Sequence, residues 1–173
     1  MTATTERPAT DTAVGVDIGL LLVRLGVGGV LLAHAAQHLF GWFNGTGIDG
    51  MARFIGQNGY PMTRPLAYVN SLSELAGGVL LVLGALTPLG AAAALGIMLN
   101  VIYIKHSSFY ATSRGFEAEY MLAIAAVGLA FAGPGRFSFD KDRPWSRGMQ
   151  AGVTAIVLGV VGAAITLLLK ITN

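Results

Sequence analysis

The chain has 173 residues, of which 54% are hydrophobic and only 12% are charged, and its mean hydropathy is +0.65. A soluble domain of this size could not bury so much apolar surface, so the composition predicts an integral membrane protein with one domain. The net charge is only +2, and no run of Lys and Arg with interleaved aromatic residues occurs, which argues against a nucleic-acid partner. Cysteine is absent, so any redox chemistry needs a bound cofactor or a partner protein.

The amino-terminal residues 1–15 lack the basic start and short apolar core of a cleavable signal peptide, and we predict a disordered tail. The first membrane span is expected at 16–40, because about 20 residues cross a hydrocarbon layer of about 30 Å. The pair Gly15 and Gly19 and the small residues at 26–29 are typical of transmembrane helices that approach one another closely.

The segment 41–65 is too polar and too rich in glycine to cross a membrane. Within it, Ile48, Met51, Phe54 and Ile55 recur at helical spacing. This pattern predicts a short amphipathic helix on the membrane surface.

Four further spans are predicted at 66–86, 89–105, 117–131 and 149–169. Proline in the turn Thr87-Pro88-Leu89-Gly90 ends the second span, since it disfavours helix at the preceding residue. The stretch Gly133-Pro134-Gly135 ends the fourth span, and a charged loop covers 136–147. The predicted fold is therefore an all-α membrane helical bundle.

Orientation depends on Lys and Arg in the short loops, which are evenly divided between the two sides of the membrane. On the amino-terminal side, however, Arg136, Lys141, Arg143 and Arg147 lie close together beside two span ends. We therefore predict a multi-pass protein of the plasma membrane with its amino terminus in the cytoplasm.

Ionisable residues inside or at the ends of the spans are the candidate functional residues, because a charge in hydrocarbon is costly. They are Arg24, His34, His38, Glu74, His106, Glu117 and Glu119. At about 100° per residue, Arg24, His34 and His38 share one face of the first span, and we expect that face to point into the bundle. The directions of the spans place the remaining polar residues together at one end of the bundle.

Each of these residues also has a plainer interpretation. His34 and His38, one helical turn apart, could bind a metal or a haem with His106 opposite, or could form ordinary hydrogen bonds at a helix end. Glu74 is the strongest single candidate, because a carboxylate at that depth is protonated or paired and either state serves proton transfer or head-group binding. A structural hydrogen bond from Glu74 to His34 or Asn100 is an equal alternative.

The remaining charges favour structural roles. Glu117 and Glu119 are expected to cap the amino end of the fourth span, where the helix dipole attracts anions. Arg24 could extend towards Asp17 and the membrane surface instead of entering a site.

Four sequence motifs occur in a characteristic order. They are LLLVRLGVGGVLLAHAAQHLFG, GMARFIGQNGYP, SELAGGVLLVLGALTPLG and EAEYMLAIAAVGLAFAGPGRFSFD. Together they resemble the DoxX family of small bacterial membrane proteins over about residues 20–140. The resemblance implies a four-helix core at 16–140, and leaves 141–173 as a linker and an extra span that could pack against a partner or close a dimer.

What the resemblance implies about function is a link to redox processes. A related protein is a subunit of thiosulfate:quinone oxidoreductase, and mycobacterial members are tied to a membrane complex with superoxide dismutase and a sulfurtransferase. The residues that match the family's motifs are Arg24, His34, Gln37, Glu74, Gly77, Gly78, Glu119 and the stretch 133–140. His38 stands where the family commonly has lysine, so a lysine-dependent ligand contact does not carry over.

Three functions follow as hypotheses. The first is a redox-linked accessory subunit of an oxidoreductase complex, with His34 and Glu74 as catalytic candidates and a quinone head group as ligand. Its pocket would comprise Arg24, His34, Gln37, Glu74, His106 and Glu119. The second is a non-enzymatic scaffold that holds soluble redox enzymes through the loop 136–147.

The third is a small transporter, which the lack of an evident internal repeat disfavours. The expected cofactor is a quinone, ahead of haem or of a metal bound by His34, His38 and His106. The expected partners are the lipid bilayer and either redox enzymes or a second copy of the chain.

Overall fold

The computed structural model describes residues 9–110 and 115–171. Within these ranges the chain forms six α-helices and no strand, which confirms the all-α prediction. They are α1 (Ala9–Phe40), α2 (Gly47–Gln57), α3 (Thr63–Leu83), α4 (Thr87–Lys105), α5 (Glu117–Ala132) and α6 (Gly148–Ile171), with a short 3₁₀ turn at Pro144–Ser146 before α6.

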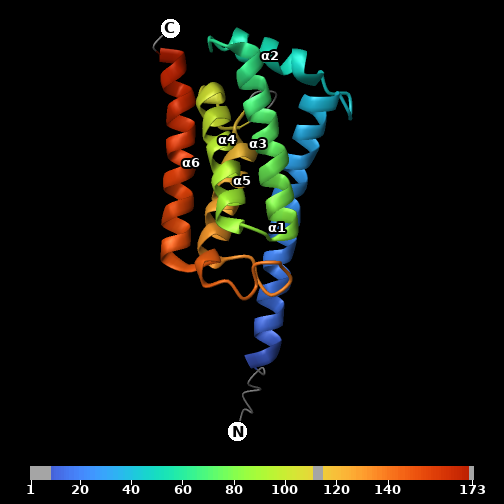
Figure 1. Ribbon diagram of the computed structural model, residues 1–173, viewed down its shortest axis with the longest axis vertical. Helices are drawn as coiled ribbons and strands as arrows, with labels where there is room; N and C mark the ends of the chain where they lie inside the picture. Colours follow the sequence, from blue (N-terminus) through green and yellow to red (C-terminus); the bar gives the residue numbers. More distant parts are fainter. Residues whose placement is uncertain (1–8, 111–114, 172–173) are drawn as a thin grey trace.

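The long helices run up and down side by side, and α2 lies across one end of them (Figure 1). We call this end the α2 end, and the opposite end, which carries residues 133–147, the loop end. The expected surface helix is present as α2, and its Ile55 is buried against Tyr60 and Ala67. Phe54, which was expected on the same apolar face, stays 40% exposed.

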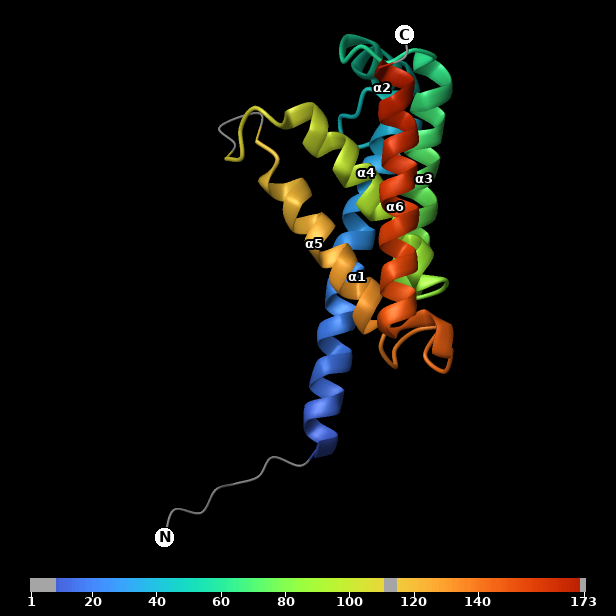
Figure 2. The same ribbon diagram turned by 90° about the vertical axis from the view of Figure 1, so that its left-hand side faces the viewer.

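Four of the described helices are long and apolar enough to cross a membrane: α1 from Ala13, α3, α4 and α6. The span predicted fourth along the chain, 117–131, is α5, which has 16 residues and is not among these four. At 1.5 Å per residue its length is about 24 Å, short of a hydrocarbon layer of about 30 Å. In Figure 2, α5 is inclined to the bundle and still leads the chain from the α2 end to the loop end.

The first helix begins at Ala9, although residues 1–15 were predicted to be disordered. Residues 9–15 contain two alanines and no proline, and extending an existing helix avoids the cost of nucleating a new one. The rest of the predicted tail, residues 1–8, lies outside the described residues.

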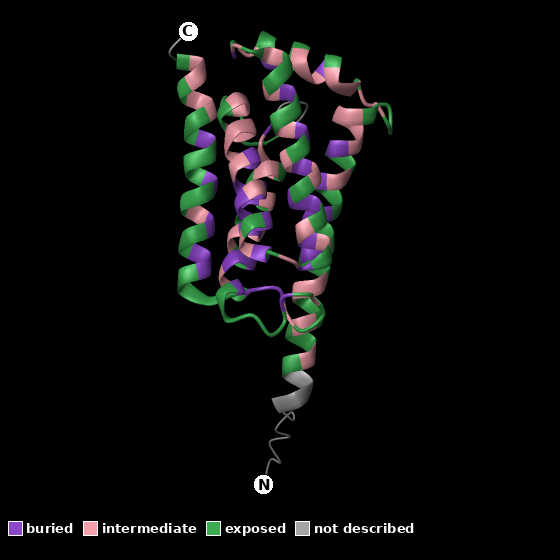
Figure 3. Ribbon diagram, viewed as in Figure 1, coloured by how far each residue is buried: buried purple, intermediate pink, exposed green. Residues whose placement is uncertain are grey.

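Burial concentrates where the helices face one another, as Figure 3 shows. Glycine allows two of these contacts. A Cβ at Gly28 would lie 2.9 Å from the Gly78 carbonyl oxygen, and one at Gly96 would lie 3.0 Å from that of Gly159. The expected role of glycine in close helix approach is therefore confirmed at Gly28.

The other glycines of α1 that were expected to pack face away from the bundle. A Cβ at Gly15, Gly19, Gly26 or Gly29 would meet no atom within 4 Å. Because α1 packs through one side only, these glycines, with the exposed Leu22 among them, form an open strip on its opposite side that has no protein neighbour in the described structure.

Candidate functional site

Glu74 is buried between α1 and α3 with both of its carboxylate oxygens bonded. Its Oε2 lies 2.8 Å from Nδ1 of His38, and its Oε1 accepts a hydrogen bond of 2.9 Å from the Asn70 amide. The residue is 4% exposed, so the carboxylate is both deep and paired, as the sequence suggested. We call Glu74, His38 and Asn70 the Glu74 cluster.

The hydrogen-bond partners predicted for this carboxylate, His34 and Asn100, are not the ones that it has. Asn70 lies one turn before Glu74 on the same helix, a spacing that brings two side chains together. Asn100, the alternative, instead donates to the Gly96 carbonyl oxygen and accepts a hydrogen bond from Thr166.

His34 does not enter the bundle, contrary to the expectation that it shares the inward face of α1. It is exposed, and its ring stacks on that of His38 with the two centroids 5.8 Å apart. The buried side of α1 passes through Leu31 and Ala35, and His38 continues this line whereas His34 lies about 100° from Ala35. His38 therefore reaches α3 and His34 does not.

Arg24 lies far from the Glu74 cluster, although it shares the buried face of α1. Fourteen residues separate Arg24 from His38, about 21 Å along the helix axis. Its guanidinium is 1% exposed and donates hydrogen bonds to the carbonyl oxygens of Pro134, Phe137 and Val82. Arg24 thus holds the loop end together and lies outside the Glu74 cluster.

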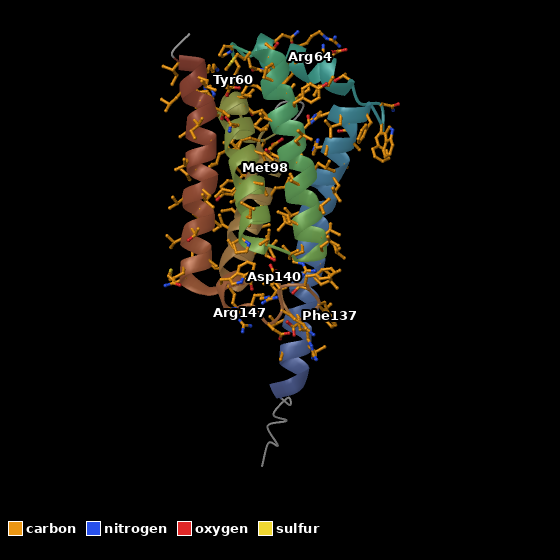
Figure 4. The ribbon with its side chains drawn as sticks, in the orientation of Figure 1. Tyr60, Arg64, Met98, Phe137, Asp140 and Arg147 are labelled. Carbon is orange, nitrogen blue, oxygen red and sulfur yellow. The ribbon has the colours of Figure 1, made fainter. Side chains whose placement is uncertain are left out.

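The stretch 133–140, which matched a family motif, also holds the loop end together. The Asp140 carboxylate accepts hydrogen bonds from the backbone N–H and the hydroxyl of Thr87, at 2.9 and 3.1 Å. Asp17 accepts one from the Arg136 N–H at 3.0 Å, so it is not the partner of Arg24. Figure 4 shows Phe137 and Asp140 at this end, opposite Tyr60.

The remaining predicted residues occupy other places at the α2 end. Glu119 forms an ion pair with Lys105 at 2.6 Å, which joins α5 to α4, and its helix has no side-chain cap. His106 is exposed, with its Nδ1 2.7 Å from the Tyr103 carbonyl oxygen. Gln37 donates to the Phe43 carbonyl oxygen at 3.4 Å, within the turn that follows α1.

The six residues expected to line one pocket are therefore divided among separate sites. The three histidines proposed as metal ligands do not converge, since only His34 and His38 are neighbours. Over residues 9–110 and 115–171, no group of three or more His, Asp or Glu side chains is placed to hold a metal ion.

A cavity of about 410 Å³ lies between α2, α3, α4 and α6, a feature the sequence analysis missed. Its walls are mainly apolar, with polar side chains contributed by Tyr60, Asn70, Ser73, Asn100 and Thr166. Asn70 both lines this cavity and donates to Glu74, so the Glu74 cluster adjoins it. Small residues of α4, namely Ala92, Ala93 and Gly96, leave this space between α3 and α6, and they were the sequence signal for it.

Tyr60 closes the α2 end of this cavity. Burial, and to a smaller extent the neighbouring Tyr103, raises the pKa of the Tyr60 phenol above its ordinary value. The phenol therefore keeps its proton at neutral pH and remains a hydrogen-bond donor.

These features define a multi-pass helical membrane protein with a buried carboxylate beside an apolar cavity. The sequence profile of one family, DoxX, matches residues 19–107, which are 89 of the 173 residues. The chain therefore belongs to the DoxX family. The matched region runs from α1 to the end of α4, and no curated protein and no solved structure matches the chain.

Proposed function

We propose that this protein is a redox-linked accessory subunit of an oxidoreductase complex in the plasma membrane and that it binds a quinone. The observation that carries the proposal is the Glu74 cluster at the edge of an apolar cavity. A quinone needs this combination, because its ring and tail require an apolar sheath and its carbonyl oxygens require hydrogen-bond donors.

The cluster supplies a path for the protons of quinone chemistry. The His38 side chain is 22% exposed and contacts Glu74, and Glu74 contacts Asn70 at the cavity wall. A proton taken up at His38 can pass to the Glu74 carboxylate, from which a water beside Asn70 would carry it to a ligand, because an amide itself does not relay protons. Electrons must come from a partner protein, since the chain has no cysteine to carry them.

The exposed side of the loop end favours a second candidate function, a scaffold for soluble redox enzymes. Arg136, Lys141, Arg143 and Arg147 are exposed there, next to Phe139 and Trp145, which are 76% and 49% exposed. Arg24 and Asp140 hold the loop in one conformation. A rigid basic and aromatic surface is suited to an acidic protein partner.

We further propose that the loop end and the amino terminus face the cytoplasm. The same four cations support this orientation, because basic residues next to span ends are retained on the cytoplasmic side. A second copy of the chain could cover the open glycine strip of α1, since small residues let membrane helices approach closely.

The quinone proposal is tested by Glu74→Gln in protein purified from native membranes, followed by solvent extraction and quantification of bound quinone. We expect the variant to lose about tenfold or more of its quinone, because the uncharged side chain weakens the hydrogen bond that holds Asn70 at the cavity wall, and hydrogen bonds to charged groups contribute about 1.5–3 kcal/mol. Asp142→Asn, the same chemical change at an exposed loop carboxylate, is the control and should leave the quinone content unchanged.

Wild-type protein without any bound quinone would contradict the proposal, and so would full retention in Glu74→Gln. If the Glu74→Gln complex keeps its activity while replacing the four loop cations by Gln separates the partner enzymes, the scaffold function is the correct one.

A further inference from the structure

A buried hydroxyl at the α2 end of the cavity has no partner. Tyr60 is 8% exposed, its ring packs against Ile55 and Ala67, and its oxygen has no hydrogen-bond partner among the described residues. An unsatisfied buried hydroxyl costs about 1–3 kcal/mol, so one that lines a cavity is a candidate donor to a ligand.

Three other polar side chains of the cavity differ from Tyr60, because their bonds are made within the protein. Thr166 donates to Asn100 at 2.8 Å, Asn100 donates to Gly96, and Asn70 donates to Glu74. The Lys170 ammonium lies 5.2 Å from the centroid of the Tyr60 ring and helps to hold the ring in place. Tyr60 is thus a positioned donor whose proton is available to a ligand.

Away from Tyr60, the cavity is shaped for a hydrocarbon chain. Towards the loop end its walls are Ala92, Ala93 and Gly96 of α4 and Leu158, Gly159 and Gly162 of α6. Most of these residues are small, so they leave room along α4 between α3 and α6, and their side chains offer nothing that a polar ligand could bond. The Tyr60 hydroxyl therefore lies at one end of the cavity, and the apolar part of the cavity extends from there towards the loop end.

We propose that this cavity binds an amphipathic lipid whose carbonyl oxygen accepts a hydrogen bond from the Tyr60 hydroxyl and whose hydrocarbon chain lies along α4, between α3 and α6. Two kinds of molecule share this chemistry: an isoprenoid or alkyl quinone, with a ring carbonyl, and a phospholipid, with an ester carbonyl. Only the quinone case rests on the proposed function, since it would place the ring between Tyr60 and Asn70.

Two substitutions test the two halves of the site. Tyr60→Phe removes the hydroxyl and keeps the ring. Gly162→Leu fills the channel without displacing the backbone, because a Cβ at Gly162 meets no atom within 4 Å. Gly128→Leu is the matched control, since Gly128 of α5 is equally open but does not line the cavity.

The probes are decylubiquinone and palmitoyl-oleoyl phosphatidylglycerol, each titrated separately into the full chain in detergent and followed by native mass spectrometry. For the probe that binds, we expect Gly162→Leu to weaken binding at least tenfold and Tyr60→Phe to weaken it by about three- to tenfold, the range of a single hydrogen bond. Gly128→Leu should bind like the wild type.

The outcomes separate this inference from the proposed function. Binding of decylubiquinone that responds to both substitutions supports both. Binding of phosphatidylglycerol alone, with the same response, supports the lipid site and counts against the quinone function. If neither substitution weakens either probe, the lipid site is overturned, and quinone retention that still depends on Glu74 would leave the proposed function standing.

Discussion

At the scale of single residues, the burial of Glu74 is possible because each carboxylate oxygen has its own partner. An unpaired carboxylate in an apolar interior would be protonated or would destabilise the fold. One partner comes from the same helix and the other from α1. The helical register of α1 decides that this second partner is His38, since His34 one turn earlier is exposed.

The two histidines therefore form a matched pair for a test. We expect His38→Ala to lower the free energy of unfolding by about 1–3 kcal/mol, the cost of leaving a buried acceptor unsatisfied. His34→Ala should change it by less than about 0.5 kcal/mol, as is usual for exposed positions. Thermal unfolding in detergent micelles measures both.

His38→Lys adds a second check on the same pair. A lysine at this position keeps a hydrogen-bond donor within reach of Glu74, so it should recover most of the stability lost in His38→Ala. Equal destabilisation by His34→Ala and His38→Ala would contradict the assigned pairing.

At the scale of helices, α1 and α3 approach closely because each has a glycine where their backbones meet. Gly28 and Gly78 face each other, and a Cβ on Gly28 would come within 2.9 Å of both the Gly78 oxygen and Val82 Cγ2. This contact holds α1 beside α3 and so brings His38 to Glu74.

Substitution at neighbouring glycines tests this packing. Gly28→Leu should lower the free energy of unfolding by about 1–3 kcal/mol or more, because overpacking forces the helices apart. Gly26→Leu, where a Cβ meets nothing, should be neutral or stabilising by up to about 1 kcal/mol, because leucine favours helix over glycine. The measurement is the midpoint of thermal unfolding of each variant relative to the wild type. If Gly26→Leu lowers this midpoint as much as Gly28→Leu does, the contact is refuted.

At the scale of the whole molecule, the two ends of the helical bundle are closed by different structures. The loop end is closed by Arg24 and Asp140, which bond to backbone and side-chain groups of distant segments. The α2 end is covered by α2 and holds the Glu74 cluster and the Tyr60 side of the cavity. The short α5 connects the two ends.

This arrangement predicts the membrane topology. The chain has no cysteine, so single cysteines at Ser108 and Asp142, on either side of α5, can be labelled selectively. We expect a membrane-impermeant maleimide added to intact cells to label Ser108→Cys and not Asp142→Cys, and labelling of both after permeabilisation. Labelling of both from the same side would show that α5 does not cross.

Much of the architecture was predictable from sequence because it depends on local properties. Hydropathy over about 20 residues indicates membrane residence, and the proline in 87–90 and the glycines in 133–135 mark helix ends. The amphipathic spacing at 48–55 likewise located α2. The span predicted at 117–131 coincides with α5, although its 16 residues are few for a membrane crossing.

The grouping of polar residues was decided by the tertiary structure. Whether His34 or His38 meets Glu74 depends on the rotation of α1 against α3, and the Arg24 bond to Pro134 joins residues 110 positions apart. The cavity exists only where four helices leave space together. The sequence by itself determined that this is a helical membrane protein with costly buried charges, because these follow from the transfer energies of its side chains. Which charged residues share a site depends on how the helices pack, because a small rotation of one helix exchanges one neighbouring side chain for another.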